Sequence, residues 1–111
     1  MTGFDFPYSP MERVHDSLNG ISLHIKRDDL VHPVIEGNKW RKLKYNLEFA
    51  LQNGFRTIVS VGGAFSNHIL ALSQAGKIYN LNTRGYIYGA HIDLDNPTLS
   101  ACRANGMEVI S

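Results

Sequence analysis

The chain has 111 residues, of which 43% are hydrophobic and 19% are charged, and its formal net charge is +1. This composition is typical of one globular domain with a modest core, and it excludes the strongly basic surface of a nucleic-acid-binding or anionic-membrane-binding protein. The five histidines have no metal-ligand spacing, and the single Cys102 can form no internal disulfide. We therefore predict no metal site and a reducing, cytoplasmic compartment. Residues 1–10 lack the features of a signal peptide, and no segment is predicted to cross a membrane.

The first elements are predicted from periodicity. Residues 1–20 are polar and rich in turn-forming residues, and no element is assigned to them. Ile21, Leu23 and Ile25 alternate with polar residues, which predicts a strand. From Lys39 the period changes to three or four residues, which predicts a helix over residues 39–52. Its apolar stripe consists of Trp40, Leu43, Leu47, Ala50 and Leu51, with Asn38 as the predicted N-cap and Asn53-Gly54 as the stop.

The rest of the chain alternates strands and helices. The β-branched run 57–61 predicts a buried parallel strand, and it is followed by a turn at 62–67 and a helix near 69–75. A strand at 85–88, a helix at 97–104 that is capped by Asn96, a stop at Asn105-Gly106 and a strand at 107–110 follow. This order predicts an α/β fold with a parallel sheet and helices on its faces. Because the sequence ends on a strand, we expect it to be part of a larger architecture.

Lys39 is the first candidate for chemistry. It lies in the first turn of a predicted helix, close to Arg41, Lys42 and Lys44. The helix dipole and these cations disfavour a charged amine, and a neutral lysine can attack an aldehyde. The same terminus would attract an anion, and Lys42 could lie near it. The charge pattern alone favours a solvated basic helix face instead.

The turn from Gly62 to His68 is the second candidate. It follows a parallel strand at its carboxyl end, where open α/β sheets bind ligands. Its glycines allow close approach of the backbone, and Ser66 and Asn67 could face a ligand or could only cap the next helix. The sequence contains neither a complete dinucleotide-binding glycine motif nor a nucleotide phosphate loop.

Three ordered blocks resemble the 1-aminocyclopropane-1-carboxylate deaminase and D-cysteine desulfhydrase family. They span residues 26–30, 37–43 and 60–68, and the segments 96–99 and 105–107 resemble the family's continuation. The resemblance implies the pyridoxal-phosphate fold of the tryptophan-synthase-β type, with the cofactor between two α/β domains. It predicts that residues 1–40 contribute to the large cofactor domain, including the cofactor lysine, and that residues 41–111 form part of the small domain. The rest of the fold, including the loop that holds the cofactor phosphate, is expected elsewhere.

The resemblance also implies the roles of individual residues. Lys39 matches the lysine that binds pyridoxal 5'-phosphate, and Ser66 matches the serine that faces the substrate. Asn67 matches the asparagine beside the cofactor ring, Asn38 and Lys42 are expected near the cofactor, and His68 near the substrate. Histidine at position 68 favours D-cysteine over the cyclopropane substrate. The aromatic side chains are expected in the core or a pocket wall (Trp40, Phe65, Tyr86 and Tyr88), and Cys102 is expected to be a small buried hydrophobe.

The function implied for the complete protein is that of a lyase or deaminase acting on a small amino acid. D-cysteine would give pyruvate, hydrogen sulfide and ammonia, and the cyclopropane substrate would give 2-oxobutyrate and ammonia. The complete protein is expected to be a homodimer with no nucleic-acid or membrane partner, and the 111-residue chain alone is expected to be inactive. The alternative is an α/β module without catalytic activity.

Overall fold

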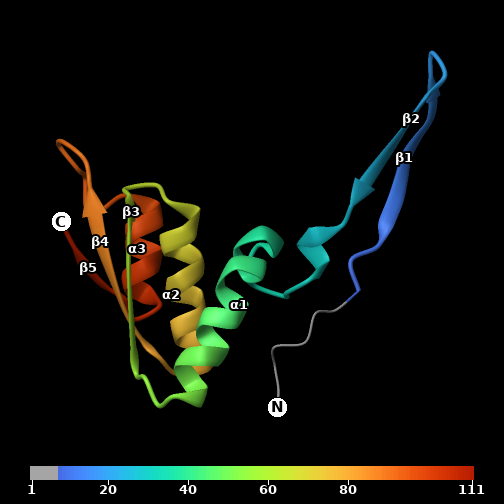
Figure 1. Ribbon diagram of the computed structural model, residues 1–111. Helices are drawn as coiled ribbons and strands as arrows, with labels where there is room; N and C mark the ends of the chain where they lie inside the picture. The colour runs from blue at the N-terminus through green and yellow to red at the C-terminus, as the bar shows by residue number, and fades with distance from the viewer. Residues whose placement is uncertain (1–7) are drawn as a thin grey trace.

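The computed structural model describes residues 8–111, which form a projecting hairpin and an α/β layer (Figure 1). The hairpin consists of β1 (Met11–Leu18) and β2 (Ile21–Lys26), and it is followed by the short 3-10 helix η1 (Asp28–Leu30) and by helix α1 (Gly37–Gln52). The layer contains β3 (Thr57–Gly63), α2 (Asn67–Tyr79), β4 (Asn82–Tyr88), α3 (Pro97–Ala104) and β5 (Glu108–Ile110). The prediction of no signal peptide falls largely outside the described residues.

The hairpin was predicted only in part. Strand β2 is confirmed, but β1 lies in the region to which no element was assigned. Asn19 and Gly20 join the two antiparallel strands with φ values of 53° and 79°, the two positive angles that a type I′ turn requires. An Asn-Gly pair is the strongest short-range hairpin signal, so the sequence did contain the evidence for β1. All six residues of β2 are exposed.

Helix α1 is confirmed, but its predicted N-cap is wrong. The helix begins at Gly37, and the carbonyl oxygen of Glu36 accepts the first helical hydrogen bond, from the backbone N–H of Trp40, at 2.8 Å. Asn38 therefore lies inside the first turn. A Cβ on Gly37 would lie 1.9 Å from the carbonyl oxygen of Asp28, so only glycine fits this contact. Packing against η1, rather than a capping side chain, sets the start of the helix.

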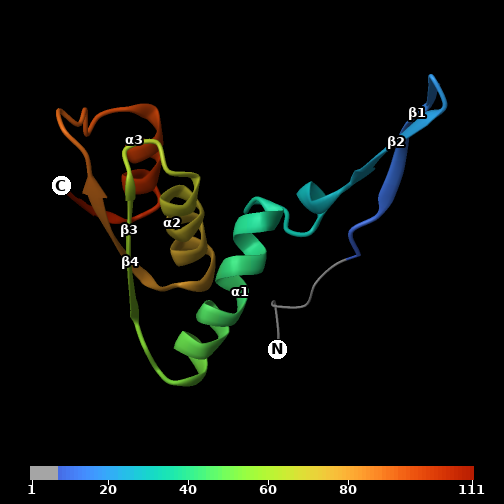
Figure 2. The same ribbon diagram turned by 45° about the horizontal axis from the view of Figure 1, so that its top comes forward.

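The parallel sheet is confirmed, with the strand order β3-β4-β5. Helices α2 and α3 lie on the same side of it in both views (Figures 1 and 2). The predicted α/β fold with flanking helices is therefore confirmed, but the prediction of a buried β3 is wrong, because the helices cover only one face of the strand. Val59 and Val61 on β3 are 51% and 59% exposed, and Tyr88 on β4 is 67% exposed. Strand β4 also begins three residues earlier than predicted, at Asn82.

The core lies between the covered face of the sheet and the helices. It joins α1, α2 and α3 through buried residues that include Trp40, Leu43, Leu47, Ile69, Leu72, Leu99 and Cys102. The prediction for Cys102 is confirmed, since its side chain is fully buried. Trp40 is also in the core, whereas Phe65, Tyr86 and Tyr88 are exposed and do not belong to it, and their place in a pocket wall stays a prediction. The predicted helix ends at 53–54 and 105–106 are confirmed. None of the helices within residues 8–111 is both long and apolar enough to cross a membrane.

Candidate active site

The turn between β3 and α2 is formed by tight packing at Gly62. A Cβ on Gly62 would lie 2.5 Å from Cγ1 of Ile69 and 2.9 Å from Oγ of Ser66. Ser66 is the N-cap of α2, and its hydroxyl oxygen accepts a hydrogen bond from the backbone N–H of Ile69 at 3.2 Å. The cap uses a lone pair and leaves the hydroxyl proton available. The capping role and a role toward a ligand are therefore compatible.

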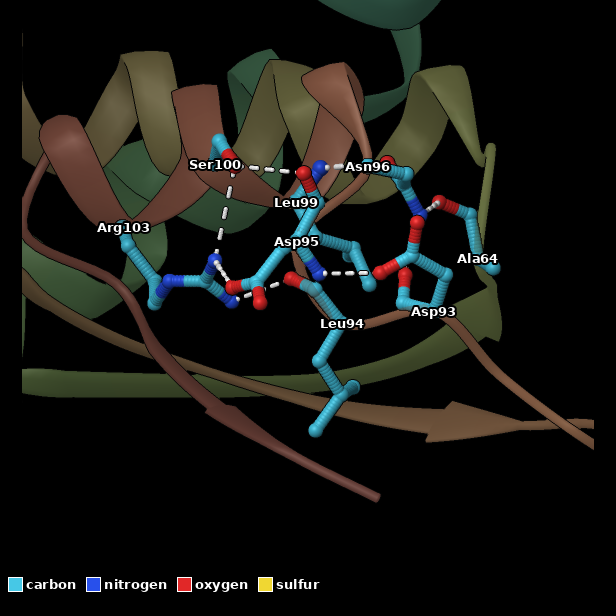
Figure 3. A network of polar contacts seen from close by, with 8 residues as sticks. All are labelled: Ala64, Asp93, Leu94, Asp95, Asn96, Leu99, Ser100 and Arg103. Carbon is cyan, nitrogen blue, oxygen red and sulfur yellow. Dashed lines mark hydrogen bonds and ion pairs between the residues drawn. The ribbon is translucent and has the colours of Figure 1, made fainter.

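The loop before α3 is hydrogen-bonded to this turn through Asn96. Asn96 is 4% exposed, and its amide nitrogen donates to the carbonyl oxygens of Ala64, at 3.1 Å, and Asp93, at 3.0 Å (Figure 3). Its amide oxygen accepts from the backbone N–H of Leu99 at 2.9 Å and so caps α3, as predicted. Nearby, Arg103 pairs with Asp95 and fixes the same loop. The turn that carries Ser66 and Asn67 is thus attached to the start of α3.

The first turn of α1 carries the other predicted side chains. Lys39 is half-buried, whereas Asn38 and Lys42 are exposed. Arg41 contacts both carboxylate oxygens of Asp28, at 3.0 and 3.1 Å, and this contact lowers the pKa of Asp28. The ion pair therefore ties the first turn of α1 to η1. Lys39 lies between Arg41 and Gly37, both of which contact Asp28.

His68 connects the two regions. Its imidazole Nε2 lies 2.7 Å from the hydroxyl oxygen of Ser60 on β3. Burial lowers the pKa of His68, and the charges of Lys39 and Lys42 lower it further. The two lysines of α1 are therefore close enough to act electrostatically on the first turn of α2. This is the closest link between the predicted lysine and the predicted serine turn.

His32 supports α1 and was not predicted as important. Its Nδ1 accepts hydrogen bonds from the backbone N–H groups of Val34 and Ile35, at 3.1 and 3.0 Å, and its Nε2 lies 3.3 Å from the hydroxyl of Tyr79. Its ring also contacts the Trp40 ring, with centroids 4.5 Å apart. Burial lowers the pKa of His32. A histidine beside a proline turn gives no sequence signal for this role.

The predicted site is assembled in part. Ser66, Asn67 and His68 lie at the carboxyl end of β3. The charges of Lys39 and Lys42, on α1, lower the pKa of His68. A cavity of about 460 Å³ is lined by Asn38 and segment 28–37, but neither Lys39 nor Ser66 lines it. Among the described residues, no group of three or more His, Cys, Asp or Glu side chains could hold a metal ion. The division at residue 40 stays a prediction, and α1 runs through that point.

Known proteins resemble this chain in sequence. No family model matches the chain. The bifunctional D-cysteine desulfhydrase/1-aminocyclopropane-1-carboxylate deaminase of Arabidopsis thaliana is 40% identical over 65 residues, which are 59% of this chain and 16% of that protein. The 1-aminocyclopropane-1-carboxylate deaminase of Allorhizobium ampelinum is 42% identical over 75 residues, 65% of this chain and 22% of that protein. The D-cysteine desulfhydrase of Yersinia pestis is 38% identical over 69 residues, 62% of this chain and 21% of that protein.

A solved structure agrees with these relatives. The crystal structure of an aminocyclopropane-carboxylate deaminase homologue superposes with a TM-score of 0.73 at 31% identity, and the match covers 94% of this chain and 32% of that one. The chain thus spans about a fifth of the length of the curated relatives and a third of the solved structure. In sequence and in fold, the chain is a relative of the 1-aminocyclopropane-1-carboxylate deaminases and D-cysteine desulfhydrases.

Proposed function

We propose that this chain contributes the cofactor lysine and the substrate-facing turn to a pyridoxal-phosphate-dependent lyase or deaminase that acts on a small amino acid. The observation that carries the proposal is the turn of Ser66 and Asn67 at the carboxyl end of β3, where such folds bind ligands. The charge of Lys39, a primary amine, lowers the pKa of His68 in the same turn and supports the proposal. The relatives found by sequence and the solved structure found by fold are named as deaminases or desulfhydrases, which supports this class of reaction.

The residues present fit one end of pyridoxal phosphate. Lys39 offers an amine for its carbonyl group, and Asn67 offers an amide for the polar edge of its ring. Asn38 and Lys42 lie on the same turn of α1 as Lys39 or one turn from it, and Lys42 supplies a positive charge for the phosphate side. A glycine-rich phosphate loop is not found among the described residues, so we assign the rest of the phosphate site to another part of the protein.

Each residue would then have a separate task. The bound cofactor supplies an electron sink for a carbanion at the substrate Cα. Lys39 would hold the cofactor through its amine before substrate binds, and the freed amine would then be the group that moves a proton at the substrate Cα. Ser66 offers its hydroxyl to the substrate while its lone pair caps α2. His68 is held as a neutral imidazole at the substrate side, because burial and the two lysines oppose its protonation.

We propose D-cysteine as the substrate, with pyruvate, hydrogen sulfide and ammonia as products. The sequence resemblance implies this choice, because it associates histidine at position 68 with the desulfhydrases. The second candidate is 1-aminocyclopropane-1-carboxylate, in whose ring opening Ser66 would take part to give 2-oxobutyrate and ammonia. Measuring sulfide and 2-oxobutyrate with both substrates in parallel separates the two.

The cofactor lysine can be identified directly. The protein is incubated with pyridoxal phosphate, reduced with borohydride and digested, and the labelled peptide is sequenced. We expect the label on Lys39, with Lys39→Arg as the unlabelled control. A label on Lys42 or Lys44 would show that another lysine binds the cofactor and would overturn the role of Lys39, whereas no label would favour an α/β module without catalytic activity.

A further inference from the structure

Ser60 lies in the strand that leads to the candidate site but belongs to none of the assigned residues. It occupies the same face of β3 as Ile58 and Gly62, the face that α2 covers, and its side chain is half-buried. Its hydroxyl oxygen lies 2.7 Å from Nε2 of His68. Among the described residues, neither this hydroxyl nor Nδ1 of His68 has another hydrogen-bond partner. The two side chains therefore form an isolated pair.

The chemistry of the pair selects one arrangement of protons. A serine hydroxyl has one proton, and Nε2 of His68 is its only acceptor in the described part of the chain. If the hydroxyl donates that proton, Nε2 must be unprotonated, and the proton of a neutral imidazole must then be on Nδ1. The opposite arrangement, with Nε2–H donating to the serine oxygen, leaves two groups without a partner among the described residues, the hydroxyl proton and the Nδ1 lone pair, whereas the first arrangement leaves only the Nδ1–H proton.

We propose that Ser60 is a positioning residue that holds the neutral imidazole of His68 in its Nδ1–H tautomer and fixes the orientation of the ring. His68 then presents an N–H donor without a positive charge at the substrate end of α2. The tautomer and the ring orientation follow from the chain's own contacts. Only the last step, in which Nδ1–H contacts the amino-acid substrate, rests on the proposed function.

Nitrogen-15 NMR of the histidine side chains measures the tautomer in the protein without cofactor. We expect His68 to show a protonated Nδ1 and an unprotonated Nε2. Ser60→Ala should shift the population toward the Nε2–H form that free imidazole side chains prefer in water, and Ser60→Thr should restore the original state. Ser100→Ala, which removes an exposed hydroxyl on α3, is the matched control. A wild-type His68 already in the Nε2–H form would overturn the proposal, and this result does not depend on how any variant folds.

A second arm follows the loaded, complete protein. Loss of one positioning hydrogen bond of about 1 kcal/mol corresponds to a roughly fivefold fall in kcat/KM for Ser60→Ala, and Ser60→Thr should recover most of it. The cofactor content should be unchanged in both variants, since neither touches Lys39. Equal kcat/KM in Ser60→Ala and wild type would contradict the positioning role. Failure of borohydride labelling at Lys39 would instead contradict the proposed function and leave the tautomer result intact.

Discussion

The side-chain amide of Asn96 donates a 3.1 Å hydrogen bond to the carbonyl oxygen of Ala64, which joins the cap of α3 to the turn before α2. The two residues are 32 positions apart. Because Asn96 is buried and all three of its amide contacts are made within the protein, the turn has little freedom to move relative to α3. The Ser66 turn is therefore held through Ala64 by a residue from a distant part of the chain, whose hydrogen bonds are to Ala64, Asp93 and Leu99.

Asn96→Ser tests this attachment. Serine keeps an oxygen that can cap α3 but loses the donors to Ala64 and Asp93, so we expect a loss of about 1–2 kcal/mol in the free energy of unfolding. Asn96→Asp should lose more, since it buries a carboxylate against two carbonyl oxygens. Urea denaturation measures both variants. A serine variant as stable as wild type would mean that the contact to Ala64 contributes nothing.

The two glycines of the β3–α2 turn should respond differently to the same substitution. Gly62→Ala places a methyl group 2.5 Å from Ile69 and 2.9 Å from the Ser66 hydroxyl, and overpacking of this kind costs about 1–3 kcal/mol. Gly63→Ala is the matched control, because no atom lies within 4 Å of its added Cβ. Urea denaturation measures the free energy of unfolding of the two variants, and Gly62→Ala should be the less stable. Equal stability of the two variants would show that α2 can shift without cost.

Ser66 combines a cap with a proposed role toward substrate, and the two can be separated. Ser66→Ala should lower stability by about 1 kcal/mol through loss of the cap, and it should also lower turnover in the loaded protein. Ser66→Asn keeps an acceptor for the Ile69 N–H but has no hydroxyl, so stability should recover while turnover stays low. Asn67→Ala should instead change the absorption spectrum of the bound cofactor. Recovery of turnover with stability in Ser66→Asn would reduce Ser66 to a capping residue.

His32 should make the stability of the fold depend on pH. Its pKa in the folded protein is below the ordinary value of 6.5, because burial disfavours the charged ring. As the pH falls, His32 is therefore protonated in the unfolded chain before it is protonated in the folded protein. The contribution of the neutral His32 ring to the free energy of unfolding is fully present above about pH 6.5 and is lost as the pH falls through the folded pKa. In His32→Asn the amide oxygen can replace Nδ1 as the acceptor for Val34 and Ile35 without titrating.

The measurement compares the free energy of unfolding at pH 7.5 and pH 5.5 in wild type and His32→Asn. The pKa of His68 is also lowered, so wild type and variant share its contribution, and the difference between them isolates His32. We expect a smaller loss in the variant. The same loss in both proteins would show that the His32 ring tolerates protonation in the folded state.

The open face of the sheet should promote self-association of the purified 111-residue chain. Val61 on that face is 59% exposed, beside other exposed apolar side chains of β3 and β4. Val61→Lys should raise the monomer fraction in sedimentation velocity experiments. Val34→Lys is the control, since Val34 is similarly exposed, at 54%, but lies before α1. If both substitutions act equally, the effect is one of general charge and not of this face.

The sequence alone was sufficient for the elements whose signals are local. The stripe from Trp40 to Leu51, the asparagine cap at Asn96 and the Asn-Gly stops act within one or two turns of the chain, so their periods and caps predict helices correctly. The same is true of Ser66 as a cap. The Asn19-Gly20 turn is an equally local signal, but the hairpin was not predicted from it, because no element was assigned to residues 1–20.

Only the tertiary structure decided which surfaces are covered and which distant residues meet. The β-branched run of β3 is compatible with burial on both faces, but helices that cover one face leave Val59 and Val61 exposed. The start of α1 is set by contact between Gly37 and Asp28, which overrides the capping preference of Asn38. The pairs Ser60–His68 and Ala64–Asn96 depend on packing of α2 against β3 and on the path of the loop before α3. No periodicity specifies such contacts, because they arise from how complete elements pack.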